Sequence, residues 1–265
     1  MPWSSPVTSC WPSADPPGQG KQGTARATRR RDGFALRSGP MTHLSHRVWL
    51  AGAGGLVGRA LLDELLSQPL YVEALMRRER QDLPLSDRLS QHCVDFSAPG
   101  LAARLPAPDA VFICLGTTIK QAGSQQAFKA VDLDAVLNTA RAARQAGARR
   151  CGVVSALGAS PGSSVFYNRI KGEMESGLRE LGFERLVIAR PSLLLGDRAA
   201  LGQPERAGER WASRLSGPFS GLIPKRWRPI EASTVARALR LAMAQPGPAL
   251  SVLESGELLD LGSTT

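Results

Sequence analysis

The stretch from Val48 to Gly58 is the feature that most constrains what this chain of 265 residues can fold into. Four apolar residues, 48–51, are followed by a cluster of glycines and then by apolar residues at helical spacing, which predicts a strand, a tight turn and a helix. Glycines let backbone N–H groups approach an anion, and the N-terminus of a helix carries partial positive charge. The turn is therefore a candidate site for the pyrophosphate of a dinucleotide.

The glycines of this turn fit two spacings. Gly52, Gly54 and Gly58 read as GxGxxxG, whereas Gly52, Gly55 and Gly58 read as GxxGxxG. Neither is the strict GxGxxG of the commonest dinucleotide sites. A strand-to-helix turn without a ligand is the structural alternative. The choice between the two interpretations depends on the rest of the chain.

From Arg47 onwards, strand patterns alternate with helix patterns. The predicted strands are 47–51, 71–76, 92–96, 110–115, 151–155, 185–190 and about 249–253, and the predicted helices are 56–67, 124–146, 165–181 and 232–244. This order predicts an α/β fold with a doubly wound, mostly parallel, Rossmann-like sheet. We expect one such domain over 41–265, with a small C-terminal cap formed by 192–231. The strand order should reverse between the first and fourth strands, so the turns that follow them should face one ligand.

Residues 1–40 are rich in proline, glycine and serine and show no amphipathic period. We expect a disordered N-terminal extension. A transit peptide and, more faintly, a twin-arginine signal around 29–31 are the alternatives. Met41 stands just before the first strand. Residues 1–40 would also fit a translation start that has been placed too early, upstream of Met41.

The charge of the chain limits the classes of partner that it is expected to bind. The formal net charge is +10, of which residues 1–40, with six basic and two acidic residues, contribute +4. The remaining +6 suits a protein that handles phosphate-bearing ligands. Beyond residue 40 the arginines are scattered among acidic residues rather than gathered into a stripe, so we expect no specific nucleic-acid partner. No apolar run approaches the roughly 20 residues of a membrane span, so we expect no transmembrane segment.

The four cysteines, Cys10, Cys93, Cys114 and Cys151, have no CxxC spacing. Three of them fall inside predicted strands, which favours buried, reduced thiols and a cytoplasmic location. His43 and His46 have no further histidine or cysteine near them in sequence. We therefore predict no metal site.

Two arginines follow the second predicted strand. In a dinucleotide fold the end of this strand lies beside the adenosine ribose, where an acidic residue binds a 2′-hydroxyl and an arginine pairs with a 2′-phosphate. Arg77 and Arg78 precede any acidic residue there, which favours NADP(H) over NAD(H). The alternative is a solvated pair at a strand end. Asp95, in the third predicted strand, is placed where its side chain could meet the adenine amino group.

Three residues form a candidate catalytic group. Ser155 ends the fifth predicted strand, and Tyr167 and Lys171 lie four residues apart on the helix that follows, so they share one face. An ammonium group favours the ionised form of a neighbouring phenol. Such a tyrosine can give a proton to a carbonyl oxygen as hydride reaches the carbon, while a serine hydroxyl supports the developing oxyanion. The alternative is a surface tyrosine with a lysine beside it.

The glycine-rich turn, Ser155 and Tyr167-Asn-Arg-Ile-Lys171 together resemble the short-chain dehydrogenase/reductase superfamily. The stretches 114–118, 131–132 and 190–198 are similar to its atypical branch around the Tat-interacting oxidoreductase. The resemblance covers about residues 47–245 and implies a Rossmann-like, NADP(H)-binding oxidoreductase. By that likeness Lys171 would also reach the nicotinamide ribose. The expected cofactor contacts are Gly52, Gly54, Gly55, Leu56, Val57, Gly58, Arg77, Arg78, Asp95, Phe96, Leu115, Gly116, Thr117, Lys171 and Pro191.

Two departures from the family pattern bear on function. Asp132 stands where extended members often have asparagine, and the stretch available for a cap is short. Within the cap, arginines recur every four residues over 205–216, where the structural interpretation is a cap helix that packs Trp211 on the sheet. Functionally, this basic face could meet an anionic substrate, an acidic protein partner or a membrane surface. A catalytically silent, NADP(H)-sensing interaction protein is therefore the alternative to an enzyme. The carbonyl substrate, the direction of reaction and the choice between monomer and homodimer stay open.

Overall fold

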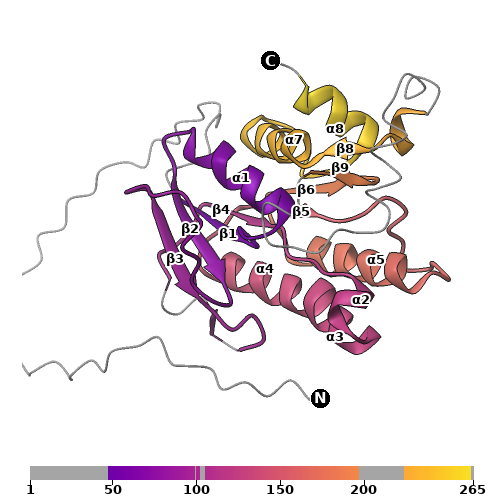
Figure 1. Ribbon diagram of the computed structural model, residues 1–265, viewed down its shortest axis with the longest axis horizontal. Coiled ribbons are helices and arrows are strands. Elements are labelled where there is room, and N and C mark those ends of the chain that lie inside the picture. Colours follow the sequence, from indigo (N-terminus) through magenta and orange to yellow (C-terminus); the bar gives the residue numbers. More distant parts are fainter. Residues whose placement is uncertain (1–46, 99, 102–104, 197–223, 264–265) are drawn as a thin grey trace, which may run out of the picture. The chain divides into compact units, whose positions relative to one another are not determined.

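The computed structural model describes residues 47–98, 100–101, 105–196 and 224–263 (Figure 1). These residues belong to one compact unit, Thr42–Thr265. The predicted N-terminal extension, and residues 197–223 of the predicted cap with the arginines of 205–216, lie outside the described residues.

A seven-stranded parallel sheet with the order β3-β2-β1-β4-β5-β6-β9 forms the centre of the fold (Figure 1). Its strands are β1 (Arg47–Ala51), β2 (Tyr71–Met76), β3 (Leu89–Cys93), β4 (Ala110–Ile113), β5 (Arg150–Val154), β6 (Arg185–Arg190) and β9 (Leu250–Glu254). The chain runs outwards from β1 to β3 and then returns to β4 on the other side of β1. The strand order therefore reverses between β1 and β4, which confirms the predicted Rossmann-like α/β fold.

Helices cover both faces of the sheet (Figure 1). One face carries α1 (Leu56–Leu66), α7 (Ala232–Ala244) and α8 (Ser255–Gly262), and the other carries α2 (Ile119–Ala122), α3 (Gln125–Lys129), a π-helical turn η2 (Ala130–Ala135), α4 (Val136–Gln145) and α5 (Phe166–Arg179). A second sheet pairs β7 (Leu194–Leu195) with β8 (Ile230–Glu231), next to the short helix η4 (Lys225–Trp227). Both strands of this small sheet come from the segment predicted as a cap.

Each face of the main sheet has its own hydrophobic core. Leu61 and Leu65 of α1 pack with Leu239 of α7 in one core, whereas Phe128 and Met174 lie in the other, and all five side chains are fully buried. Because both faces are covered, the central strands are apolar almost throughout rather than alternating, as expected for a parallel sheet. The rigid sheet fixes the positions of the loops at the carboxyl ends of its strands.

Several predicted boundaries are wrong, for identifiable reasons. The third strand is Leu89–Cys93 rather than 92–96, because its pairing with β2 ends where Cys93 meets Met76. Asp95 then turns the chain by accepting hydrogen bonds from the backbone N–H and the hydroxyl of Ser97, so Asp95 and Phe96 follow the strand. The predicted helix 124–146 consists of α3, η2 and α4, and α8 was not predicted at all. That helix has only eight residues.

Candidate functional site

Close backbone contacts require glycine at two positions of the turn after β1. Gly52 has φ +91°, and a Cβ there would lie 2.6 Å from the carbonyl oxygen of Cys114, just beyond β4. A Cβ on Gly58, in the first turn of α1, would lie 2.0 Å from the carbonyl oxygen of Gly52. The turns after β1 and β4 therefore touch at the carboxyl edge of the sheet, where the sequence predicts one ligand. The absence of side chains leaves a backbone cradle at the N-terminus of α1, the kind of place where a pyrophosphate can bind.

Gly58→Ala is expected to disrupt this cradle. The added methyl group overlaps the Gly52 carbonyl, so the turn must open, at a cost of about 1–3 kcal/mol in the free energy of unfolding. Urea unfolding measures the loss of stability, and a dinucleotide titration measures the effect on binding at the turn. Gly162→Ala is the matched control, since a Cβ there meets no atom within 4 Å. Unchanged stability and binding in Gly58→Ala would contradict this account of the turn.

A buried ion pair joins α5 to η2, which is in turn hydrogen-bonded to the turn after β4. Lys171 Nζ lies 2.7 Å from Asp132 Oδ1, and the two side chains are 4% and 1% exposed. The other oxygen of Asp132 accepts a hydrogen bond of 2.8 Å from the backbone N–H of Thr117. A Cβ on Gly116 would lie 3.3 Å from Asp132 Oδ1 and 3.8 Å from Lys171 Nζ. The ammonium group is therefore held beside the residues that follow β4.

Tyr167 lies one helical turn before Lys171 on α5. Its ring packs against Phe128 of α3, with 5.5 Å between ring centroids. Among the described residues, none forms a hydrogen bond with the Tyr167 hydroxyl group. The ring is therefore held by apolar packing.

Ser155 lies beyond β5 in a second buried network. Its hydroxyl group donates a hydrogen bond of 2.6 Å to Glu175 Oε1 on α5. Arg190, the last residue of β6, donates to both carboxylate oxygens of Glu175, at 2.9 and 2.5 Å. Glu175 lies eight residues after Tyr167, so Tyr167, Lys171 and Glu175 follow one face of α5. Because the Ser155 proton is committed to Glu175 here, donation to a substrate requires this hydroxyl to rotate.

The polar residues predicted to surround the adenosine end lie beyond β2 and β3. Arg77 and Arg78 are exposed and follow β2 directly, and Asp95 is exposed after β3. The hydrogen bonds from Ser97 lower the pKa of the Asp95 carboxyl group. A third arginine, Arg80, lies against the glycine-rich turn: its Cδ and Nη1 atoms are 3.1 and 3.2 Å from where a Cβ on Gly54 would stand.

Comparison with known proteins agrees with this geometry. Residues 52–200 match the family model described as NAD(P)H-binding. This chain belongs to the NAD(P)H-binding family. It is 34% identical over 223 residues to protein HTATIP2 of Rattus norvegicus, an alignment that covers 81% of this chain and 88% of the relative. It is also 34% identical over 221 residues to the mitochondrial protein FMP52 of Eremothecium gossypii, covering 80% and 95% of the two chains. These relatives fit the predicted atypical branch of the short-chain dehydrogenase/reductases.

Solved structures share the fold of this NAD(P)H-binding family member at low sequence identity. The Bordetella bronchiseptica enzyme WbmH, solved with NAD⁺, superposes with a TM-score of 0.61 at 18% identity, covering 80% of this chain and 76% of that one. WbmG from the same organism, solved with NAD, gives 0.60 at 19%, covering 80% and 74%. These similarities support the fold alone.

Six residues of this NAD(P)H-binding family member form polar networks that the sequence did not predict. They are Arg59, Arg80, Asp82, Asp132, Glu175 and Arg190. The helical spacing could have pointed to Glu175, which continues the series of Tyr167 and Lys171. Asp132 stood out only as a departure from the family pattern. The remaining predicted contacts, Leu56, Val57, Leu115 and Pro191, lie in the loops and helix starts at the carboxyl ends of β1, β4 and β6.

Two of the cysteines, Cys114 and Cys151, are free thiols, and burial raises the pKa of the Cys114 thiol to about 12. The part of the chain that the structure describes holds no group of three side chains that could bind a metal ion. Nor does this part include a helix long and apolar enough to cross a membrane.

Proposed function

We propose that this protein is an NADP(H)-dependent oxidoreductase that interconverts a carbonyl group and an alcohol. The observation that carries the proposal is the arrangement on α5. Tyr167 and Lys171 share one face of α5. Lys171 Nζ lies 2.7 Å from Asp132 Oδ1, and the other oxygen of Asp132 accepts from the Thr117 N–H after β4. The glycine cradle after β1 touches the turn after β4, and Gly116 of that turn lies beside Asp132 and Lys171.

The cofactor, when bound, supplies the hydride chemistry. Tyr167 is the proposed acid, whose phenol gives its proton to the carbonyl oxygen in the direction of reduction. Lys171 is proposed to hold the nicotinamide ribose and to favour the phenolate that remains. Ser155 is the proposed donor to the carbonyl oxygen, for which its hydroxyl must leave Glu175. Glu175 would keep its two hydrogen bonds from Arg190 when Ser155 rotates.

The preference for NADP(H) over NAD(H) is part of this proposal. Arg77 and Arg78 follow β2 on the exposed surface, where the ribose 2′-phosphate of a bound NADP(H) is expected. Arginine pairs with a phosphate in bidentate geometry, whereas NAD(H) offers only hydroxyl groups at this place. Asp95 is proposed to contact the adenine amino group.

NADPH is expected to raise the melting temperature more than NADH at equal concentration. Arg77→Ala combined with Arg78→Ala should remove this difference, because the pair contributes charge-assisted hydrogen bonds to the 2′-phosphate. Thermal unfolding with each cofactor checks it. Arg141→Ala combined with Arg149→Ala, which removes the same charge elsewhere on the surface, is the control. Equal stabilisation of the parent protein by both cofactors would contradict the preference.

Turnover on a panel of aldehydes and ketones tests the enzyme proposal, with NADPH oxidation followed by absorbance. Reduction of at least one carbonyl compound, lost in Tyr167→Phe, is the expected result. A catalytically silent NADP(H) sensor would bind NADPH and reduce none of them.

For location we propose the cytoplasm, on the basis of the free thiols. Because FMP52 relatives are named mitochondrial, cell fractionation is the experiment that decides.

A further inference from the structure

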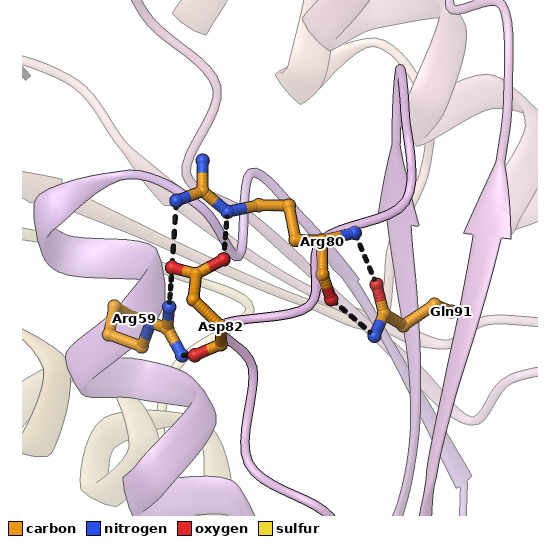
Figure 2. Close-up of polar contacts among 4 residues, drawn as sticks. All are labelled: Arg59, Arg80, Asp82 and Gln91. Atoms are coloured by element: carbon orange, nitrogen blue, oxygen red, sulfur yellow. Dashed lines mark hydrogen bonds and ion pairs between the residues drawn. The ribbon is translucent and has the colours of Figure 1, made fainter. Parts of the chain in front are cut away.

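Asp82 lies between two arginines beside the glycine-rich turn (Figure 2). Arg80 donates hydrogen bonds of 2.8 Å from Nε and from Nη2 to the two oxygens of the Asp82 carboxylate. Arg59, in the first turns of α1, donates from Nη2 to Asp82 Oδ2 at 2.5 Å and from Nη1 to the backbone carbonyl of Asp82 at 2.6 Å. One carboxylate thus receives a bidentate fork from one guanidinium and shares an oxygen with a second.

Neighbouring strands and turns hold Arg80 in place. The carboxamide of Gln91 on β3 accepts from the backbone N–H of Arg80 at 3.0 Å and donates to its carbonyl oxygen at 2.9 Å (Figure 2). The side chain then extends to the glycine-rich turn, where its Nη1 atom lies 3.2 Å from the place of a Cβ on Gly54. The guanidinium group is therefore positioned at the turn before any ligand binds.

The exposures of the three side chains show which of them faces the solvent. The side chains of Arg59 and Arg80 are 17% and 27% exposed, whereas that of Asp82 is 49% exposed. Asp82 is therefore the most solvent-exposed of the three side chains, and the two arginine side chains are more buried. The hydrogen bonds from Arg80 lower the pKa of the Asp82 carboxyl group to about 2, so Asp82 is ionised under any ordinary assay condition.

We propose that Arg59 and Arg80 form a phosphomonoester site for the 2′-phosphate of NADP(H), and that Asp82 occupies this site until the cofactor displaces it. This inference rests on the proposed function and adds two arginines and an internal competitor to Arg77 and Arg78. Guanidinium groups bind carboxylates and phosphates with the same fork geometry. A phosphate monoester carries more charge than a carboxylate and a third oxygen, so it can displace the exposed Asp82 side chain.

Asp82→Asn tests the competition. The variant is expected to bind NADPH and adenosine 2′-phosphate about threefold more tightly, because the exposed carboxylate that pairs with both arginines is lost, with unchanged affinity for NADH and adenosine 5′-phosphate. Arg80→Ala should weaken binding of the two 2′-phosphates and leave the other two ligands unaffected. Asp87→Asn is the matched control, because it removes the same charge from an exposed position in the same loop. Calorimetric titration measures all four ligands.

Two results would overturn the inference. Weaker binding of NADPH by Asp82→Asn would make Asp82 a support for the arginines rather than a competitor. If Asp82→Asn also bound NADH and adenosine 5′-phosphate more tightly by the same factor, the effect would lie at the pyrophosphate instead of the 2′-phosphate. Failure of the proposed function gives a different pattern: NADPH then binds as stated here, but no carbonyl compound is reduced.

Discussion

Tyr167→Phe is expected to lower carbonyl turnover by at least about 100-fold while leaving the Kd for NADPH within about twofold. Proton transfer by a positioned side chain contributes about 10²–10⁴ to a rate, and phenylalanine keeps the ring packing on Phe128 but has no proton to give. Steady-state kinetics with any substrate found in the panel, together with a calorimetric NADPH titration, gives both numbers.

The chain offers a matched control for this variant. Tyr71, its only other tyrosine, is 47% exposed on β2, so Tyr71→Phe removes the same hydroxyl group away from the crevice. Turnover by Tyr71→Phe should equal that of the parent protein. Retention of more than about a tenth of parental turnover in Tyr167→Phe would contradict the role of Tyr167 as the acid.

Asp132→Ala is expected to destabilise the protein by about 3–5 kcal/mol. Removing one member of a buried ion pair leaves the other charge without compensation, and Lys171 is only 4% exposed. The Thr117 N–H group loses its acceptor at the same time. Urea unfolding followed by circular dichroism gives the free energy of unfolding.

Three further variants separate the ion pair from other effects: Asp134→Ala, Lys171→Met, and Asp132→Ala combined with Lys171→Met. Asp134→Ala removes an exposed carboxylate from the same π-helical turn and should change stability by less than about 0.5 kcal/mol. Asp132→Ala combined with Lys171→Met removes both charges and should recover part of the lost stability. A double variant that is as unstable as the sum of its single variants would show that the pair is not coupled.

The parts of the fold that could be predicted from the sequence depend on local patterns. The continuous apolar strands and the glycine cluster after β1 indicate a doubly wound sheet. In such a sheet the chain runs outwards from β1 and then returns to its other side, so the reversal of strand order follows. The spacing of Tyr167 and Lys171 places them on one face of α5 because helix geometry is regular. These inferences needed no information about contacts between distant residues.

The polar networks could not be predicted, because each depends on a contact across the fold. Glu175 resembles an exposed helix residue in the sequence, but Arg190 from β6 and Ser155 from beyond β5 meet it in the interior. Asp82 lies in a polar loop, and only the packing of that loop on α1 brings it to Arg59. The end of β3 was misplaced for a similar reason, since the length of β2 decides where pairing stops.

The structure of the complex with NADPH tests the central claim most directly. The account predicts the pyrophosphate at the turn from Gly52 to Gly58, Lys171 Nζ on the nicotinamide ribose and the Tyr167 hydroxyl group facing the nicotinamide ring. A Tyr167 hydroxyl turned away from that ring, or a dinucleotide bound outside the crevice above β1 and β4, would contradict it.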